Sequence, residues 1–151
     1  MLDELAAVAD RFPDDKEGNL ELARYLCGYN LWTRAGRLRP LAAFLADEHL
    51  RTDGELRAWA RRSDYQEDFA GRVPGLWPAA YQSLLMRLGV DTVKPDVRVR
   101  RFVEGVLGHP VNDAELVRAV TEAAHRLGRP ARDLDGAIWE HGALGGGGGR
   151  H

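Results

Sequence analysis

The sequence predicts an all-α fold, a compact multi-helix domain of about seven or eight helices. Apolar side chains recur at helical intervals almost throughout the 151 residues. No stretch of β-branched residues alternates over five or more positions, as a strand would require. Because 44% of the residues are apolar and 29% are charged, we expect one globular domain over residues 1–144. A flexible glycine-rich tail is expected over residues 145–151.

The first half of the chain contains four stripes, that is, four stretches in which apolar residues recur at helical spacing and predict a helix. The first is closed by Phe12-Pro13, and the second follows Asn19, whose side chain can cap a helix. The third follows a break at Gly36, and Asp53 can cap the fourth. Their apolar positions are, in chain order, Leu2, Leu5, Ala6 and Ala9; Leu20, Leu22, Ala23, Leu26 and Cys27; Leu38, Leu41, Ala42 and Leu45; and Leu56, Trp59 and Ala60.

Four more stripes follow in the second half. The fifth stops at Gly89, the sixth comes after Pro95, the seventh opens at Asp113, and the eighth begins near Ala131. Their apolar positions are Tyr81, Leu84, Leu85 and Leu88; Val97, Val99, Phe102, Val103 and Val106; Leu116, Val117, Val120 and Ala124; and Leu134, Ile138 and Trp139. We expect three aromatic side chains to lie in the core, those of Tyr25, Trp59 and Trp139.

Composition excludes several classes of protein. No apolar run approaches the roughly 20 residues of a membrane span, and no basic segment followed by an apolar one marks a secretory signal. We therefore expect a cytoplasmic protein with no membrane partner. Cys27 is the only cysteine, which excludes an internal disulfide, a four-cysteine zinc site and an iron–sulfur cluster. We expect no metal and no cofactor, and no obligate protein partner is evident.

The charge of the chain is nearly balanced, but its cations are unusual. A net charge of −2 argues against a surface coated in positive charge for nucleic acid. Of the 21 basic side chains, only Lys16 and Lys94 are lysines, and the rigid fork of arginine suits phosphate better than the ammonium of lysine. Because a GC-rich genome also explains an excess of arginine, the positions of the arginines matter more than their number.

Two segments stand out, a tight turn in residues 73–81, whose residues 73–76 match the hairpin described below, and a basic stretch at residues 93–102. On these segments the chain resembles the helix-hairpin-helix (HhH-GPD) DNA glycosylase superfamily, which contains endonuclease III and the alkylbase glycosylases. Its members carry a Leu-Pro-Gly-Val-Gly hairpin, then a helix and a Val-Asp-Thr-His motif, with an arginine five residues beyond the aspartate. Asp96 matches that aspartate and Arg101 that arginine. Residues 134–142 look like the Leu-Asp-x-x-Leu-Trp-x-x-Gly ending of some members.

The resemblance implies a monofunctional DNA glycosylase. Such an enzyme hydrolyses the N-glycosidic bond of a damaged base, such as an alkylated purine, that is flipped out of duplex DNA. Bifunctional members carry a lysine just after the hairpin, and residues 77–80 contain none, so AP-lyase activity is not expected. The chain also departs from the family: Trp77 stands in place of the second glycine, Arg98 replaces the histidine, and the iron–sulfur cluster loop is absent.

The turn has the residues that a phosphate site needs. Gly75 can adopt a positive φ, so that backbone N–H groups point outward together, and Pro78 suits the first turn of a helix whose N-terminus favours anions. A Pro-Gly turn is also common in proteins that bind nothing. The Trp77 indole either reduces access to the backbone or stacks on DNA. The candidate DNA contacts here are Val73, Pro74, Gly75, Leu76, Trp77 and Ala79.

Asp96 is the candidate catalytic residue. Placed after Pro95, it can simply cap a helix, a structural role worth about 1 kcal/mol. A helix dipole also favours the anion, and an ionised carboxylate can stabilise a cationic sugar and orient the attacking water. Lys94, Arg98 and Arg101 are candidate contacts to flanking phosphates. The alternatives are an exposed cationic face paired with acids and, for Arg101, an internal support.

The candidate base pocket contains Tyr29, Asn30 and Trp32. Aromatic faces bind unpaired bases by stacking, although such residues are more often part of a core. Asn30 lies where an early helix of the family ends in a glutamine.

Two other functions stay open. A non-catalytic DNA-binding protein that retains the glycosylase fold would bind duplex DNA in a salt-dependent way without releasing a base. An α-helical protein-interaction domain would show no affinity for DNA, and the acidic balance of the chain favours it.

Overall fold

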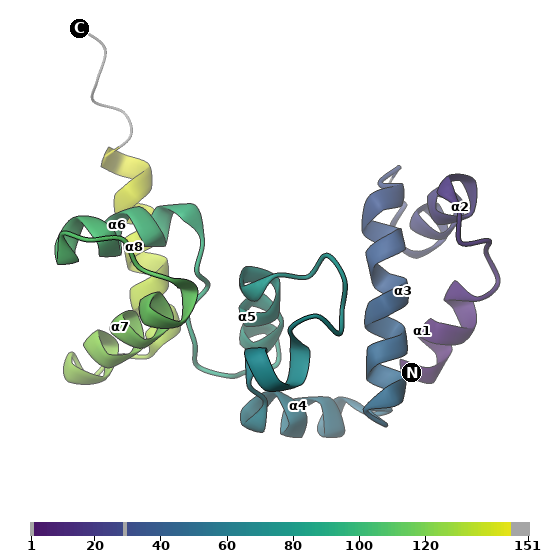
Figure 1. Cartoon of the computed structure of the whole chain (residues 1–151), viewed down its shortest axis with the longest axis horizontal. Helices are drawn as coiled ribbons and strands as arrows, with labels where there is room; N and C mark the ends of the chain where they lie inside the picture. Colours follow the sequence, from purple (N-terminus) through teal and green to yellow (C-terminus); the bar gives the residue numbers. More distant parts are fainter. Residues whose placement is uncertain (1, 29, 146–151) are drawn as a thin grey trace, which may run out of the picture. The chain divides into compact units, whose positions relative to one another are not determined.

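The computed structural model describes residues 2–28 and 30–145. These residues form eight α-helices and a five-residue π-helix with no strand among them, so the all-α prediction is confirmed (Figure 1). They fall into two compact units that divide between Leu76 and Trp77. The single domain over residues 1–144 stays a prediction. Gly145 ends the last helix instead of opening the expected tail, and the rest of that tail lies outside the described residues.

The first unit holds α1 to α4 and the π-helix η1. The N-caps of two of its helices lie earlier in the chain than predicted. The cap of α2 is Asp15, whose side chain accepts a hydrogen bond from the Gly18 N–H at 2.8 Å, and Asn19 lies inside the helix. The cap of α4 is Thr52, which forms a capping box with Glu55. The bounds are α1 Leu2–Ala9, α2 Lys16–Cys27, α3 Trp32–Asp47, α4 Asp53–Arg62 and η1 Tyr65–Phe69.

The predicted break at Gly36 is wrong, because α3 continues through both Gly36 and Pro40. A proline inside a helix cannot donate to the carbonyl four residues earlier, which here is that of Gly36. A Cβ added at Gly36 would make an ordinary van der Waals contact of 3.5 Å with the Asn19 amide nitrogen of α2, so the two helices pack against each other at this position.

Arg39 joins α3 to the segment between α1 and α2. Its guanidinium donates hydrogen bonds of 2.7–2.9 Å to the backbone carbonyls of Ala9, Phe12 and Pro13. Its Nε donates to the Asn19 side chain at 2.8 Å, which explains why Asn19 is buried. Sequence periodicity cannot reveal such a network, because it depends on residues about 20–30 positions apart.

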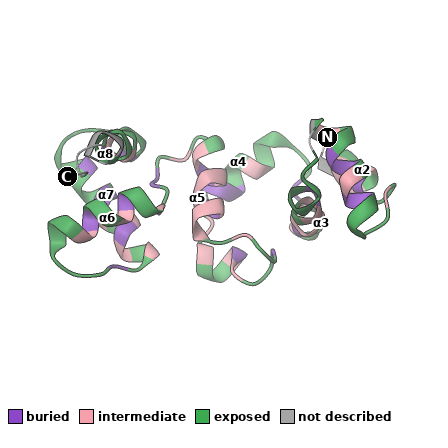
Figure 2. Ribbon diagram, turned by 90° about the horizontal axis from the view of Figure 1, so that it is seen from above, coloured by how far each residue is buried: buried purple, intermediate pink, exposed green. Residues whose placement is uncertain are grey.

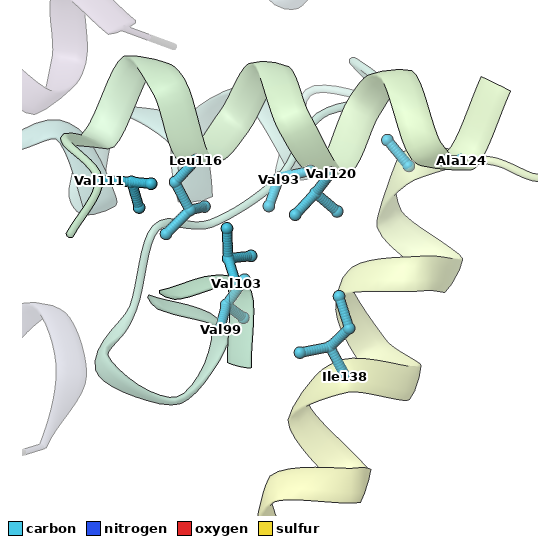
Figure 3. Close-up of a cluster of buried hydrophobic side chains, with 9 residues drawn as sticks. Val93, Val99, Val103, Val111, Leu116, Val120, Ala124 and Ile138 are labelled. Carbon is cyan, nitrogen blue, oxygen red and sulfur yellow. The ribbon is translucent and has the colours of Figure 1, made fainter. Parts of the chain in front are cut away.

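The second unit is built around a compact apolar cluster. Figure 3 shows Val99 and Val103 of α6 lying opposite Leu116 and Val120 of α7, with Ile138 of α8 closing the side. In Figure 2 the buried residues of these helices lie on the faces that meet, and the outer faces are exposed. The bounds are α5 Pro78–Arg87, α6 Val97–Leu107, α7 Asp113–Arg126 and α8 Ala131–Gly145.

Side chains from loops fix the helix ends of this unit. The Asp91 carboxylate accepts hydrogen bonds from the backbone N–H groups of Ala131 and Arg132, at 3.0 and 3.1 Å, and so caps α8 from a loop 40 residues away. These two hydrogen bonds lower the pKa of Asp91. The predicted helix start at Asp113 is confirmed, with Asn112 as its cap.

Of the three aromatic residues that we expected in the core, Trp59 is buried, with 2% of its surface exposed. The other two expectations are wrong. Tyr25 is 59% exposed and contacts Phe12 with the two rings tilted at 48°, and Trp139 is 45% exposed on α8. Helical spacing therefore indicated the correct helices, but it did not indicate how far each apolar face extends around them.

Candidate active site

Asp96 caps α6, as its position after Pro95 predicts. Its Oδ1 accepts hydrogen bonds from the backbone N–H groups of Arg98 at 2.9 Å and Val99 at 3.0 Å. Its Oδ2 has no hydrogen-bond partner among the described residues, and the side chain is half-buried. The carboxylate is therefore held rigidly by one oxygen while the other remains available. Capping and a chemical role are compatible at this position.

A second carboxyl group, that of Asp135, lies close to Asp96. Asp135 is half-buried in α8, and its Oδ1 is shielded from solvent without a hydrogen-bond partner in the described part of the chain. Burial, followed by the negative charge of Asp96, raises the pKa of Asp135 to about 6, although the Lys94 backbone and ammonium act in the opposite direction. Two acids with different environments thus lie near enough for the charge of Asp96 to act on Asp135.

Sequence analysis did not propose Asp135 as a site residue. The signal was present in residues 134–142, the segment that resembles the ending of some glycosylases. The aspartate in that segment carried no role of its own, because its closeness to Asp96 depends on α8 packing against α6 and the loop before it.

The cations near Asp96 have different environments. Lys94 and Arg101 are exposed, and within the described residues Arg101 forms no ion pair, so the alternative of an internal support for Arg101 is wrong. Arg98 lies over the Trp139 ring, with its guanidinium carbon 4.2 Å from the ring centroid. Arg100 is not available to a ligand, because it binds the Asp113 carboxylate and a backbone carbonyl.

The exposed face of α6 and α8 is aromatic as well as cationic. Phe102 is 37% exposed and meets His141 edge-on, with ring centroids 5.9 Å apart. Trp139 is held under the Arg98 guanidinium, so one of its faces is occupied. The site therefore combines two carboxyl groups with a cation stacked on an indole.

The predicted hairpin lies at the end of the first unit. The Leu76 N–H donates to the Val73 carbonyl at 3.2 Å, which closes the turn, and Gly75 has a φ of +78°, as predicted. Val73 is buried, whereas Pro74 and Gly75 are exposed. The helical element before this turn is the short η1.

A cation that sequence analysis missed lies beside this turn. A side chain on Gly75 would come within 3.5 Å of the Arg37 Nε, so the Arg37 side chain covers the glycine. Arg37 projects from α3 and is exposed. Its position 38 residues before the turn explains why local spacing gave no sign of it.

The second unit begins with the remaining hairpin candidates. Trp77 is 72% exposed and contributes only its backbone as the cap of α5. Pro78 occupies the first helical turn, as predicted, and Ala79 is half-buried. The turn at Gly75 and Asp96 thus belong to different compact units.

The residues of the candidate base pocket are only partly described. Tyr29 lies outside the described residues. The exposed Asn30 accepts a hydrogen bond from the Arg24 Nε at 3.0 Å, and Trp32, the first residue of α3, is 41% exposed. An open hollow of about 530 Å³ lies in the same unit but contains none of the predicted site residues; its walls are Ala6, Ala9, Asp10, Asp14, Arg39, Pro40, Ala42 and Ala43.

Two further features bear on cofactors and membranes. Within the described part of the chain, no three histidine, cysteine or acidic side chains are grouped so that they could hold a metal ion. Among the helices formed by these residues, none combines the length and the apolar character that crossing a bilayer needs.

No curated protein and no solved structure matches the chain. Residues 32–143 match a family that is described as a domain of unknown function (DUF8548). The match begins at the first residue of α3 and ends within α8, so it contains Asp96, Asp135 and the turn at Gly75. Because it covers well over half of the chain, the protein belongs to the DUF8548 family.

Proposed function

We propose that the protein is a monofunctional DNA glycosylase with a helix-hairpin-helix glycosylase-like fold. It would hydrolyse the N-glycosidic bond of a damaged base that is flipped out of duplex DNA. The observation that carries the proposal is the geometry of Asp96: its Oδ1 is fixed by two backbone N–H groups, and its Oδ2 is available beside exposed cations.

The chemistry follows from that geometry. As the bond between the base and C1′ of the sugar breaks, positive charge develops on the sugar, and a nearby carboxylate stabilises it. The N-terminus of α6 favours the anion, because its backbone N–H groups and the helix dipole both point toward Asp96. The free oxygen can also accept a proton from the attacking water, whose oxygen then bonds to C1′.

The exposed cations support binding of the DNA backbone. Lys94 and Arg101 flank Asp96 in the second unit, and Arg37 lies beside the exposed turn of the first unit. Each phosphate contact lowers the slope of log affinity against log salt by about 0.9 for duplex DNA. We therefore expect salt-dependent binding to undamaged duplex, with a slope of about −2 to −4.

The proposal is tested by base release under single-turnover conditions. Duplexes that each contain one lesion (7-methylguanine, hypoxanthine, ethenoadenine or uracil) are incubated with the full chain, and free base is measured by chromatography. The variant Asp96→Asn keeps a good helix cap but loses the charge, so we expect a loss of at least about 100-fold in rate. Asp15→Asn makes the same change at the cap of α2 and should leave the rate unchanged.

Three results distinguish the possibilities. Base release that requires Asp96 supports the glycosylase. Salt-dependent binding without release, unaffected by Asp96→Asn, indicates instead a non-catalytic DNA-binding protein, which the exposed Trp77 indole also suits because indoles stack on bases. No binding to DNA even at low salt would exclude both and favour a protein-interaction domain.

A further inference from the structure

Asp135 is in an environment that a carboxylate avoids. Its Oδ1 is shielded from solvent and has no hydrogen-bond partner among the described residues. A buried polar atom without a partner costs about 1–3 kcal/mol, and more when the group is charged. Such a group needs an explanation, and a role at a reactive site is one of the usual ones.

The neighbours of Asp135 increase this cost. The elements packed against α8 bring two charged groups to it: Asp96 at the start of α6, and Lys94 in the loop before α6. The effect of Asp96 is larger than that of the Lys94 ammonium. No charged group of α7, the other helix on α8, contributes within the described residues. The negative charge of Asp96 therefore favours the protonated form of Asp135.

On the basis of the proposed function, we infer that Asp135 is a second catalytic residue. It protonates the departing base while Asp96 acts as the carboxylate. The substrate is then a neutral damaged base, because a cationic alkylated purine leaves without needing a proton. This assignment names a substrate class that differs from the alkylated purine implied by family resemblance. It also gives a function to this carboxyl group, whose Oδ1 is buried without a hydrogen-bond partner among the described residues.

The proposed reaction balances with water as the only co-reactant. The bond between the base nitrogen and C1′ breaks, and its electron pair stays on the nitrogen, which receives the proton of Asp135. The oxygen of water bonds to C1′, and the proton that this water loses passes to Asp96. Transfer of that proton from Asp96 to Asp135 restores the starting state. Nothing is oxidised or reduced.

The ionisation of the pair supports this division of roles. Burial and Asp96 raise the pKa of Asp135 to about 6, so a useful fraction of the group remains protonated near neutral pH. Asp96 has a different environment, because its Oδ1 accepts hydrogen bonds from two backbone N–H groups. Pairs of acids whose environments differ in this way are typical of sites that combine acid catalysis with charge stabilisation.

The test compares neutral and cationic lesions in the full chain and in Asp135→Asn. Duplexes contain either a neutral base (hypoxanthine, ethenoadenine or uracil) or 7-methylguanine, and single-turnover release is followed from pH 5 to 8. We expect Asp135→Asn to lower the release of the neutral base at least 100-fold relative to that of 7-methylguanine. We also expect the wild-type rate on the neutral base to fall above about pH 6, and the variant to lose this fall. Asp135→Glu, which retains a carboxylic acid, should recover part of the rate.

Each other outcome overturns the inference. An equal loss on neutral and cationic lesions would show that Asp135 only supports the fold, and an unchanged rate on the neutral base would show that it donates no proton. A wild type that releases 7-methylguanine alone contradicts this inference and leaves the proposed function intact. A wild type that releases neither kind of base removes both.

Discussion

Replacing Asp135 with asparagine should stabilise the folded chain at neutral pH. The pKa of this carboxyl is raised from 3.8 to about 6 in the folded protein, so folding binds its proton more tightly. The tighter proton binding therefore stabilises the folded protein fully below about pH 4, and this stabilisation is lost as the pH rises through about 6. At pH 7 the folded wild type carries a charge that is poorly solvated and faces Asp96, and asparagine removes that charge.

The size of the effect follows from the pKa change. A rise from 3.8 to about 6 corresponds to about 3 kcal/mol. Because Asp135 is only half-buried, solvent screens part of this, and we expect a gain of about 1–2 kcal/mol in the free energy of unfolding at pH 7.5. At pH 4 the gain should shrink to a few tenths of a kcal/mol, since the wild-type carboxyl is then protonated in the folded state and about 40% protonated in the unfolded state, where its pKa is 3.8.

Urea unfolding followed by circular dichroism at both pH values measures this difference. Asp133→Asn is the matched control, because Asp133 lies on the exposed surface of the same helix, 3.8 Å from Arg132. It should change the free energy of unfolding by less than about 0.5 kcal/mol. A variant Asp135→Asn that is less stable than the wild type at pH 7.5 would refute the reasoning, because it would mean that the carboxylate is well satisfied in the folded state.

Three further substitutions test the structure, each by urea unfolding. Asp91→Ala removes the cap of α8 and should lower the free energy of unfolding by about 1–2 kcal/mol at pH 7. Because the pKa of Asp91 is lowered in the folded protein, this loss should shrink as the pH falls below about 4. A loss that stays the same at every pH would contradict the capping role. Arg39→Lys should cost about 2–3 kcal/mol, since an ammonium cannot reach all the acceptors of the guanidinium, and full stability would contradict the network. Gly75→Ala should cost about 1 kcal/mol because of its positive φ, and an unchanged stability would mean that the turn relaxes.

Local signals predicted the second unit well. Pro78, Asp96 and the start of α8 near Ala131 were predicted in place, because prolines and short polar caps act within a single turn of helix. The first unit was predicted less well. Gly36 and Pro40 look like helix breakers in sequence, but α3 continues through both of them and packs against α2.

The candidate site was only half predictable for the same reason. Asp96 is marked by its own neighbours, as a polar residue between a proline and a helix. Asp135 and Arg37 gain their roles from residues 38 to 41 positions away, Asp135 through α8 packing and Arg37 through the turn at Gly75. Such contacts depend on tertiary structure, and the periodicity of one sequence does not contain them.

The central claim is that the Asp96 carboxylate stabilises positive charge on a sugar, and the affinity for a charged sugar mimic tests it most directly. Two duplexes are compared, one with a protonated pyrrolidine in place of the damaged nucleotide and one with an uncharged tetrahydrofuran. The wild type should bind the pyrrolidine duplex at least about tenfold more tightly, as expected for a transition-state mimic, and Asp96→Asn should bind the two duplexes equally. Equal binding of both duplexes by the wild type would contradict the claim.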